Sequence, residues 1–285
     1  MSTLWSRVLL AGMGLAAAGA AGGLYVQRAH LRRDTARRVA DLLAASDDSG
    51  TGPASPPLEA LPAPIHRYLR HVLPDERPPV RSVRLRQRGS FRTAPTAVWR
   101  PFTATQHVTL RPPGFVWTAS VRMMPWVPVQ VVDEFRAGRG ALRATLGGVL
   151  TVADPPQSPA LDEAELMRYL AEAPLYPTAL LPGRGIEWTP IDYQSARATL
   201  TTHHTTASLV FHVNAQNEVS HVTGERASLT DEETTERRPW RGYWRRYALR
   251  NGLRVPLAGE VAWEHPDGTE ASYWRGHVTQ IDHFL

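Results

Sequence analysis

The sequence predicts a mainly β protein of the α+β class. Its main part is one large curved antiparallel sheet or incomplete barrel with helices packed in its concave face. One N-terminal transmembrane helix precedes the sheet in the chain. About eleven segments alternate apolar and polar residues, the period expected of strands. Their connections are short and show no strand–helix rhythm, which argues against a parallel sheet. One apolar helix interrupted by prolines stands mid-chain. An open sheet of this size must curl, close or split.

The composition excludes several functional classes. The 285 residues are 42% hydrophobic and 21% charged, as in globular proteins. There is no cysteine, which excludes disulfides, thiolate metal sites and cysteine nucleophiles. All 32 basic residues are arginine, and the net charge of +5 comes entirely from residues 1–88, because residues 89–285 are nearly neutral. A nucleic-acid-binding domain would carry a basic patch on its body, so no nucleic-acid partner is expected.

Residues 1–27 are expected to form an N-terminal membrane anchor. Residues 8–26 carry no charge over 19 positions, which is long enough for a helix that crosses a bilayer. A cleaved signal peptide is the alternative, since Ala16, Ala17 and Ala18 would suit a cleavage site. We favour a retained, single-pass anchor in the cell membrane.

Residues 28–60 are expected to form a basic juxtamembrane helix and a Pro/Gly/Ser linker. Arginines cluster just after the apolar segment, so residues 8–38 as a whole should contact membrane lipids. The positive-inside rule would place the rest of the chain in the cytoplasm. An exported carrier would need the opposite orientation, so the side of the membrane stays open.

Residues 61–285 are expected to fold as a single β-rich domain. It opens with a short helix over 61–73, which starts with prolines and ends before Pro74. Four strands should follow, and seven more after the central helix. The predicted strands are 83–91, 102–110, 115–123, 127–135, 186–192, 195–202, 206–213, 218–228, 241–250, 254–264 and 271–282.

The central helix is predicted over residues 161–173. Leu166, Tyr169 and Leu170 share one side of it, and the chain continues to residue 181 as an apolar strip broken by prolines. A helix of this kind in a β protein is expected to fill or cover the concave face of the sheet.

Five stretches together resemble a family of bacterial membrane-anchored proteins of unknown function. They are "LPAPIHRYL", "PFTATQHVTLRPPGFVW", "LMRYLAEAPLYPTALLP", "WTPIDYQSARATL" and "VPLAGEVAWEHPDGTEASYWRGHVTQI", and they span about residues 60–285. The layout is also similar to the lipoprotein-carrier fold. That resemblance implies a half-open antiparallel barrel with helices in its mouth that holds lipid tails, and it brings no established activity.

Aromatic and apolar side chains are the candidates for lining a ligand cavity. Tryptophan is abundant, at 9 residues, and most of the tryptophans fall in predicted strands. Such residues suit the wall of an apolar cavity, although an ordinary packed core is an equal alternative. The cavity candidates are Phe115, Trp117, Met123, Leu166, Tyr169, Leu170, Tyr176, Trp188 and Trp263.

Three charged residues are the candidates for a polar cavity mouth: Asp133, Arg168 and Glu172. Asp133 falls on the apolar-parity face of its strand, where a lone carboxylate needs a partner such as Arg168 or Arg136. Glu165, Arg168 and Glu172 form a polar stripe on the central helix. This stripe could bind a ligand headgroup or fasten the helix to the sheet.

We predict no catalytic residue, metal or cofactor. The chain lacks the common nucleophile, zinc, phosphate-loop and dinucleotide motifs. His203, His204 and His212 have no nearby acid at a metal-ligand spacing. The arginine-rich stretch 237–250 is preceded by acids, so a solvated hairpin is favoured over a membrane-contact strip.

The leading hypothesis is a membrane-tethered binding domain for a hydrophobic ligand, a lipid or an acylated molecule. Acyl chains would lie between the curved sheet and residues 161–181. One alternative is a membrane-associated enzyme of unrecognised class that uses Asp133, Glu165 or Glu172 as acid or base. The other is an envelope scaffold whose core is simply full.

Overall fold

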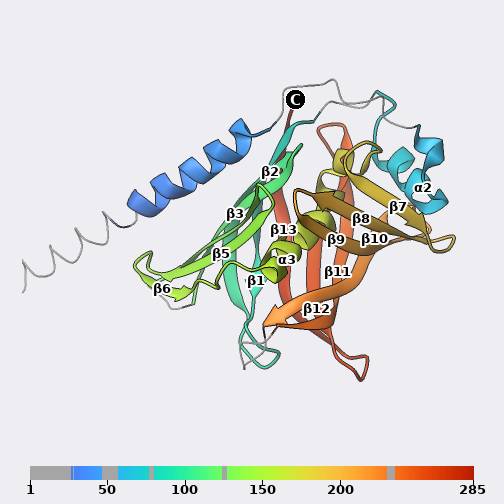
Figure 1. Ribbon diagram of the computed structural model, residues 1–285. Coiled ribbons are helices and arrows are strands. Elements are labelled where there is room, and N and C mark those ends of the chain that lie inside the picture. The colour runs from blue at the N-terminus through green and yellow to red at the C-terminus, as the bar shows by residue number, and fades with distance from the viewer. Residues whose placement is uncertain (1–26, 28, 47–56, 77–79, 124–126, 230–234) are drawn as a thin grey trace, which may run out of the picture.

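The computed structural model describes residues 27, 29–46, 57–76, 80–123, 127–229 and 235–285. Within these residues thirteen strands form one antiparallel sheet. The sheet curls into a half-barrel (Figure 1), and this curled antiparallel architecture is the one that the sequence predicts. The strands are β1 (Ser82–Phe91), β2 (Arg100–Leu110), β3 (Pro113–Val121), β4 (Val129–Arg136), β5 (Arg139–Leu146), β6 (Leu150–Ala153), β7 (Ile186–Pro190), β8 (Ser195–Thr202), β9 (Thr205–Val213), β10 (Val219–Leu229), β11 (Thr235–Arg250), β12 (Leu253–Glu264) and β13 (Glu270–Phe284).

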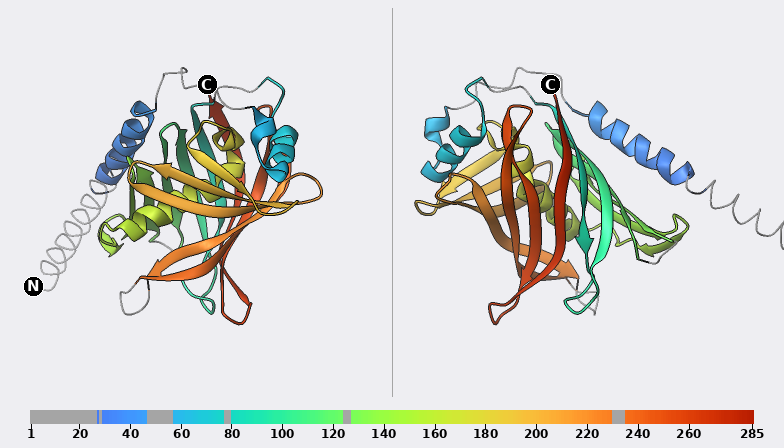
Figure 2. Two further views of the ribbon diagram at one scale, coloured as in Figure 1. Left: turned by 45° about the vertical axis from the view of Figure 1, so that its right-hand side comes forward. Right: turned by 180° about the vertical axis from the view of Figure 1, so that it is seen from behind.

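The sheet consists of two meanders joined at its centre. Strands β1 to β6 follow one another outward to one edge, and β7 to β13 run from the other edge inward. The meanders meet where β1 pairs with β13, in register from Ser82↔Phe284 to Phe91↔Trp274. The chain must therefore cross from edge strand β6 to edge strand β7. That crossing contains α3 (Pro159–Ala171), η2 (Ala173–Leu175) and η3 (Pro177–Leu180), which lie in the concave face (Figure 2).

A second helical segment lies at the end of the half-barrel near β7 and β8. It comprises η1 (Leu58–Ala60) and α2 (Ala63–Val72), close to the prediction of a helix over 61–73. Proline occupies the first turn, where its missing N–H has no intrahelical acceptor to lose. Ile65, Tyr68 and Leu69 are fully buried against the core.

The prediction of about eleven strands is wrong, because it omitted β5 and β6. Glycine and alanine are poor strand formers, so the stretch 137–153 shows no clear strand signal. The structure gives the reason for these small residues. A β-carbon on Gly140 would lie 2.6 Å from the carbonyl oxygen of Leu161, so α3 can pack directly on β5 only where the side chain is absent.

Aromatic rings lie on glycines along the inner face of the sheet. Gly276 pairs with Gly89 of β1 and with Gly259 of β12, which gives a row of glycines across three strands. The ring of Trp274 covers Gly276, and the ring of Trp244 covers Gly259. Bare glycine backbone lets the sheet bend, and the rings restore the apolar packing that glycine lacks.

The helix over residues 29–44 packs on the outer face of β3 and β4. Leu42 is 5% exposed and forms a small apolar cluster with Val116 and Val132. Arg38 binds the buried Glu134 at 2.7 Å. The basic helix is thus attached to the sheet. In the described part of the chain no helix is long and apolar enough to cross a membrane, and the predicted span 8–26 lies outside it.

Candidate functional site

The central helix fills the middle of the concave face. It begins at Pro159, two residues before the predicted start, because the side chain of Ser158 accepts a hydrogen bond from the backbone N–H of Leu161. Leu166, Leu170 and Tyr176 are completely buried. The helix is therefore a packed part of the core.

The predicted cavity residues all join one continuous core, although they lie in different parts of it. Six of them are buried around α3: Phe115, Trp117, Leu166, Tyr169, Leu170 and Tyr176. The other three, Met123, Trp188 and Trp263, are partly buried at the margins of the core. Trp188 packs edge-on against Phe211, with ring centroids 5.3 Å apart. Trp263 stacks on Tyr273 at 5.9 Å. The structure thus brings eight of them into the half-barrel and leaves Trp188 on edge strand β7.

The predicted polar residues form a buried charged network beneath α3. Arg168 binds Asp133 and, at 3.0 Å, Glu172. Glu172 also accepts a hydrogen bond from the side-chain amide of Gln106 at 2.6 Å. The guanidinium of Arg168 lies 4.9 Å from the ring of Trp117. Of the two arginines that the sequence offered as partners for Asp133, Arg168 is the one that binds it. The network connects α3 to β2 and β4.

Glu165 extends this network to the other meander. Its carboxylate accepts a hydrogen bond from Arg226 of β10 at 3.3 Å. Three acids (Asp133, Glu165 and Glu172) therefore face only two guanidinium groups, those of Arg168 and Arg226. Burial and the neighbouring Asp133 raise the pKa of Glu165 to about 8, and burial also raises the pKa of Asp133.

The network would be neutral with one bound proton, because it holds three carboxyl groups and two guanidinium groups. One carboxyl oxygen of Asp133 and one of Glu165 are buried without a hydrogen-bond donor from another residue. A proton held between these two carboxyl groups would satisfy both oxygens and would make three acids and two arginines neutral in sum. Chemically the pair resembles an acid/base dyad. Both residues are less than 7% exposed, and their ion pairs with Arg168 and Arg226 connect α3 to the sheet.

Partly exposed aromatic residues lie on the concave face beside this network. We call Phe91, Phe102, Trp263, Tyr273 and Trp274 the aromatic wall. Phe102 stacks on Trp274 with ring centroids 5.7 Å apart. The hydroxyl of Tyr273 accepts a hydrogen bond from the indole N–H of Trp240 at 3.0 Å. Only Phe102 of the five is fully buried, so the wall offers apolar surface.

Two arginines of neighbouring strands border the aromatic wall. Arg226 of β10 and Arg238 of β11 are direct partners in the strand register. The charge of Arg226 is matched by Glu165. The guanidinium of Arg238 lies 5.7 Å from the ring of Trp263. Among the described residues Arg238 has no carboxylate partner, so its charge is available to a ligand.

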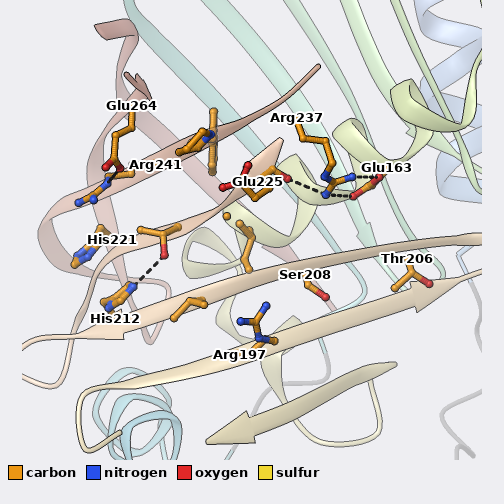
Figure 3. A pocket seen from close by; sticks show the side chains of 16 residues that line it. Glu163, Arg197, Thr206, Ser208, His212, His221, Glu225, Arg237, Arg241 and Glu264 are labelled. Atoms are coloured by element: carbon orange, nitrogen blue, oxygen red, sulfur yellow. Dashed lines mark hydrogen bonds and ion pairs between the residues drawn. The ribbon is translucent and has the colours of Figure 1, made fainter. Parts of the chain in front are cut away.

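A second, polar site lies on the outer face between β9 and β10, where a cleft has a volume of about 730 Å³ (Figure 3). Arg197, Arg237 and Arg241 line it together with Glu163, Glu225 and Glu264. His212 and His221 stack at its end, 4.1 Å apart. Burial and the neighbouring His212 lower the pKa of His221 to about 4, so this pair is neutral at physiological pH.

Sequence reasoning missed Arg226, Arg238 and the cleft. The signal that revealed Asp133 was a charged residue on the apolar face of a strand. The same signal could have revealed Arg226, because it shares its strand face with the buried Val222. The cleft had no such signal, since it depends on where two strands stop pairing. The stretch 237–250 was expected as a hairpin and is instead most of the single strand β11. Arg241 is neutralised by Glu264 at 2.7 Å.

The chain was compared with curated proteins and with solved structures. The chain has no match among curated proteins. Three solved structures are similar. A DUF1329 family protein from Desulfovibrio piger is 10% identical with a TM-score of 0.43, over 79% of this chain and 95% of that one. A putative outer membrane lipoprotein-sorting protein domain from Vibrio parahaemolyticus is 8% identical with a TM-score of 0.41, over 71% and 85%. A LolA superfamily protein from Nitrosomonas europaea is 9% identical with a TM-score of 0.39, over 79% and 95%.

A match to a family model shows which protein family the chain belongs to. The curled antiparallel sheet with a helix in its concave face is the layout that the sequence predicts. The model covers nearly the whole predicted domain. The chain belongs to the family of unknown function DUF6920, whose model matches residues 59–283.

Proposed function

We propose that this protein is a membrane-tethered binding domain for a hydrophobic molecule with an acidic headgroup, such as a fatty acid or a lysophospholipid. The apolar part would lie on the aromatic wall, and the headgroup would meet Arg238. The tether would be residues 8–26, held close to the sheet by the helix over residues 29–44.

The observation that carries the proposal is the pairing of partly exposed rings with an unmatched guanidinium. Trp263, Tyr273 and Trp274 are only partly covered, while Arg238 lies over Trp263. Apolar surface on a concave face next to one charge is the usual composition of a site for an amphiphile. The side chains of α3 are packed too tightly to form the cavity wall, so the ligand would lie beside the helix.

A chain-length series tests the proposal. We would titrate a fluorescent fatty acid into the chain from residue 29 onward and displace it with saturated fatty acids of increasing length. Each buried methylene contributes up to about 0.8 kcal/mol, so affinity should rise up to about fourfold per carbon. Binding should also quench tryptophan emission. Affinity that is independent of chain length would remove the proposal.

Matched variants locate the site. Trp263→Leu and Arg238→Ala should each weaken binding. Trp188→Leu, on edge strand β7, and Arg250→Ala, at the exposed end of β11, should leave it unchanged. Equal effects of Trp263→Leu and Trp188→Leu would place the ligand elsewhere. Loss of preference for acids over alcohols in Arg238→Ala would identify the headgroup contact.

A further inference from the structure

The sheet opens between β9 and β10. These strands pair only from Val219↔Val213 to Thr223↔Val210, yet β9 begins at Thr205 and β10 continues to Leu229. Over the remaining length each strand is paired on its other side, β9 with β8 and β10 with β11. Residues 205–209 and 224–229 therefore present two strand edges with no strand between them.

The polar cleft of about 730 Å³ occupies this opening. Residues of β9, β10 and β11 make up most of its lining on the outer face of the sheet (Figure 3). Arg197 of β8, Glu264 of β12 and Glu163 of α3 complete it. The inner side is closed by α3, because a β-carbon on Gly224 would lie 3.0 Å from the side chain of Met167 and 2.8 Å from that of Leu209. The cleft is thus separate from the aromatic wall, which lies on the concave face.

A side chain covers one backbone acceptor at the edge of β10. The carbonyl oxygen of Glu225 accepts a hydrogen bond from Arg237 at 3.1 Å. Arg237 is held in turn by Glu163, at 2.8 and 2.9 Å. An acceptor that a neighbouring strand would normally satisfy is met here by an exposed guanidinium. Exposed ion pairs contribute little, so Arg237 is readily displaced by a backbone N–H.

Among the described residues that line the cleft, one arginine has no acidic partner. Arg197 of β8 is exposed and lines the cleft opposite Arg241. Arg241 is matched by Glu264, whereas Arg197 has no acidic partner among the residues that the structure describes. The cleft therefore offers open backbone edges together with a site for a carboxylate.

We propose that the β9–β10 cleft binds an extended polypeptide segment that carries an acidic side chain. The segment would add as a strand along the edge of β10, displace Arg237 from the Glu225 carbonyl, and place its carboxylate on Arg197. Unpaired strand edges are the usual template for such strand addition. At about 3.3 Å per residue, the six residues of the β10 edge span about 20 Å. This partner site is additional to the ligand site on the concave face.

The test selects peptides that bind the full chain, held in nanodiscs of neutral lipid, from a random library displayed on phage. Peptides that still bind when the cleft is filled are removed by counter-selection against Ser208→Trp. Thr206→Trp, at an exposed position, fills the cleft in a second variant. Enriched peptides should contain an acidic residue and lack proline. Their affinity, measured by fluorescence anisotropy, should fall about fivefold or more in Arg197→Glu, and remain unchanged in Arg250→Glu.

Hydrogen–deuterium exchange identifies the mode of binding. A bound strand should protect backbone amides of residues 224–229, because they gain a hydrogen-bonding neighbour. Three results would each overturn the proposal: no enriched peptide that both tryptophan variants reject, binding without protection of 224–229, or full affinity in Arg197→Glu. Fatty-acid binding should persist in both tryptophan variants, so failure here is distinguishable from failure of the proposed function.

Discussion

The indole ring of Trp274 lies directly on Gly276, two residues further along the same strand, and a β-carbon at that glycine would overlap the ring. The contact forms in the middle of the sheet, where β13 pairs with both β1 and β12. The curvature of the half-barrel at its centre therefore depends on a residue without a side chain.

Gly276→Ala should destabilise the fold by about 1–3 kcal/mol, the usual cost of overpacking a core. Urea unfolding measures the change. The double variant Trp274→Leu/Gly276→Ala should lose less stability than the two single variants lose in sum, because the smaller side chain leaves room for the methyl group. Strictly additive effects would show that ring and glycine are not coupled.

Arg168→Met should destabilise the protein by about 3–5 kcal/mol, because it leaves the buried carboxylate of Asp133 without its cation. Arg245→Met is the control. Arg245 makes an exposed ion pair with Glu260 at 3.1 Å, so the loss should be below about 1 kcal/mol. Similar free energies of unfolding for the two variants would mean that the network beneath α3 does not hold the helix.

Glu165→Gln should stabilise the protein increasingly as pH rises. The folded pKa of Glu165 is raised to about 8 from an ordinary value near 4.5, so the folded state binds more protons between these values. Wild-type stability should therefore fall with rising pH in this window, by on the order of 1 kcal/mol per pH unit. Glutamine removes this dependence and keeps an oxygen for Arg226.

The measurement for Glu165→Gln is the difference in unfolding free energy between variant and wild type from pH 5 to pH 8. Histidines with lowered pKa values, such as His221, titrate in part of this window with the opposite sign. They are common to both proteins and cancel in the difference. A difference that does not change with pH would show that Glu165 is ionised throughout and that no proton is shared with Asp133.

Truncation tests the docked helix. A chain that starts at residue 29 should be more stable than one that starts at residue 46, by about 1.5–3 kcal/mol for the burial of Leu42. Loss of the helix also uncovers Val116. Leu42→Ala should reproduce most of the loss, whereas Leu43→Ala, at a position 38% exposed, should not. Equal stability of the two truncations would show that the helix docks weakly.

The sequence predicted the architecture well because most strands alternate cleanly. The inner residues of β2, Phe102, Ala104 and Val108, are buried, as their parity indicates. The alternation of residues did not reveal β5. Gly140 is needed there so that α3 can pack on the strand, and a glycine gives no strand signal. The pairing of β1 with β13 was also beyond prediction, because no local pattern specifies which distant strands become neighbours.

The site was partly predictable for a related reason. Asp133 on an apolar face implied a cation, and Arg168 supplied it from the one helix nearby. The contact of Glu165 with Arg226 spans 61 positions, and Arg226 belongs to the second meander, so the contact follows only from the completed fold. The β9–β10 cleft depends on where pairing stops, which no side-chain pattern records.

The junction of β1 with β13 also sets the order in which a nascent chain can fold. Strands β1 to β6 emerge first from the ribosome and can pair locally, yet the edge of β1 has no neighbour until β13 appears, almost 200 residues later, from Ser82 to Glu270. Exposed strand edges promote aggregation, and such long-range pairing is slow. Chaperones that hold unfinished β structure should therefore associate with the first meander until synthesis reaches β13.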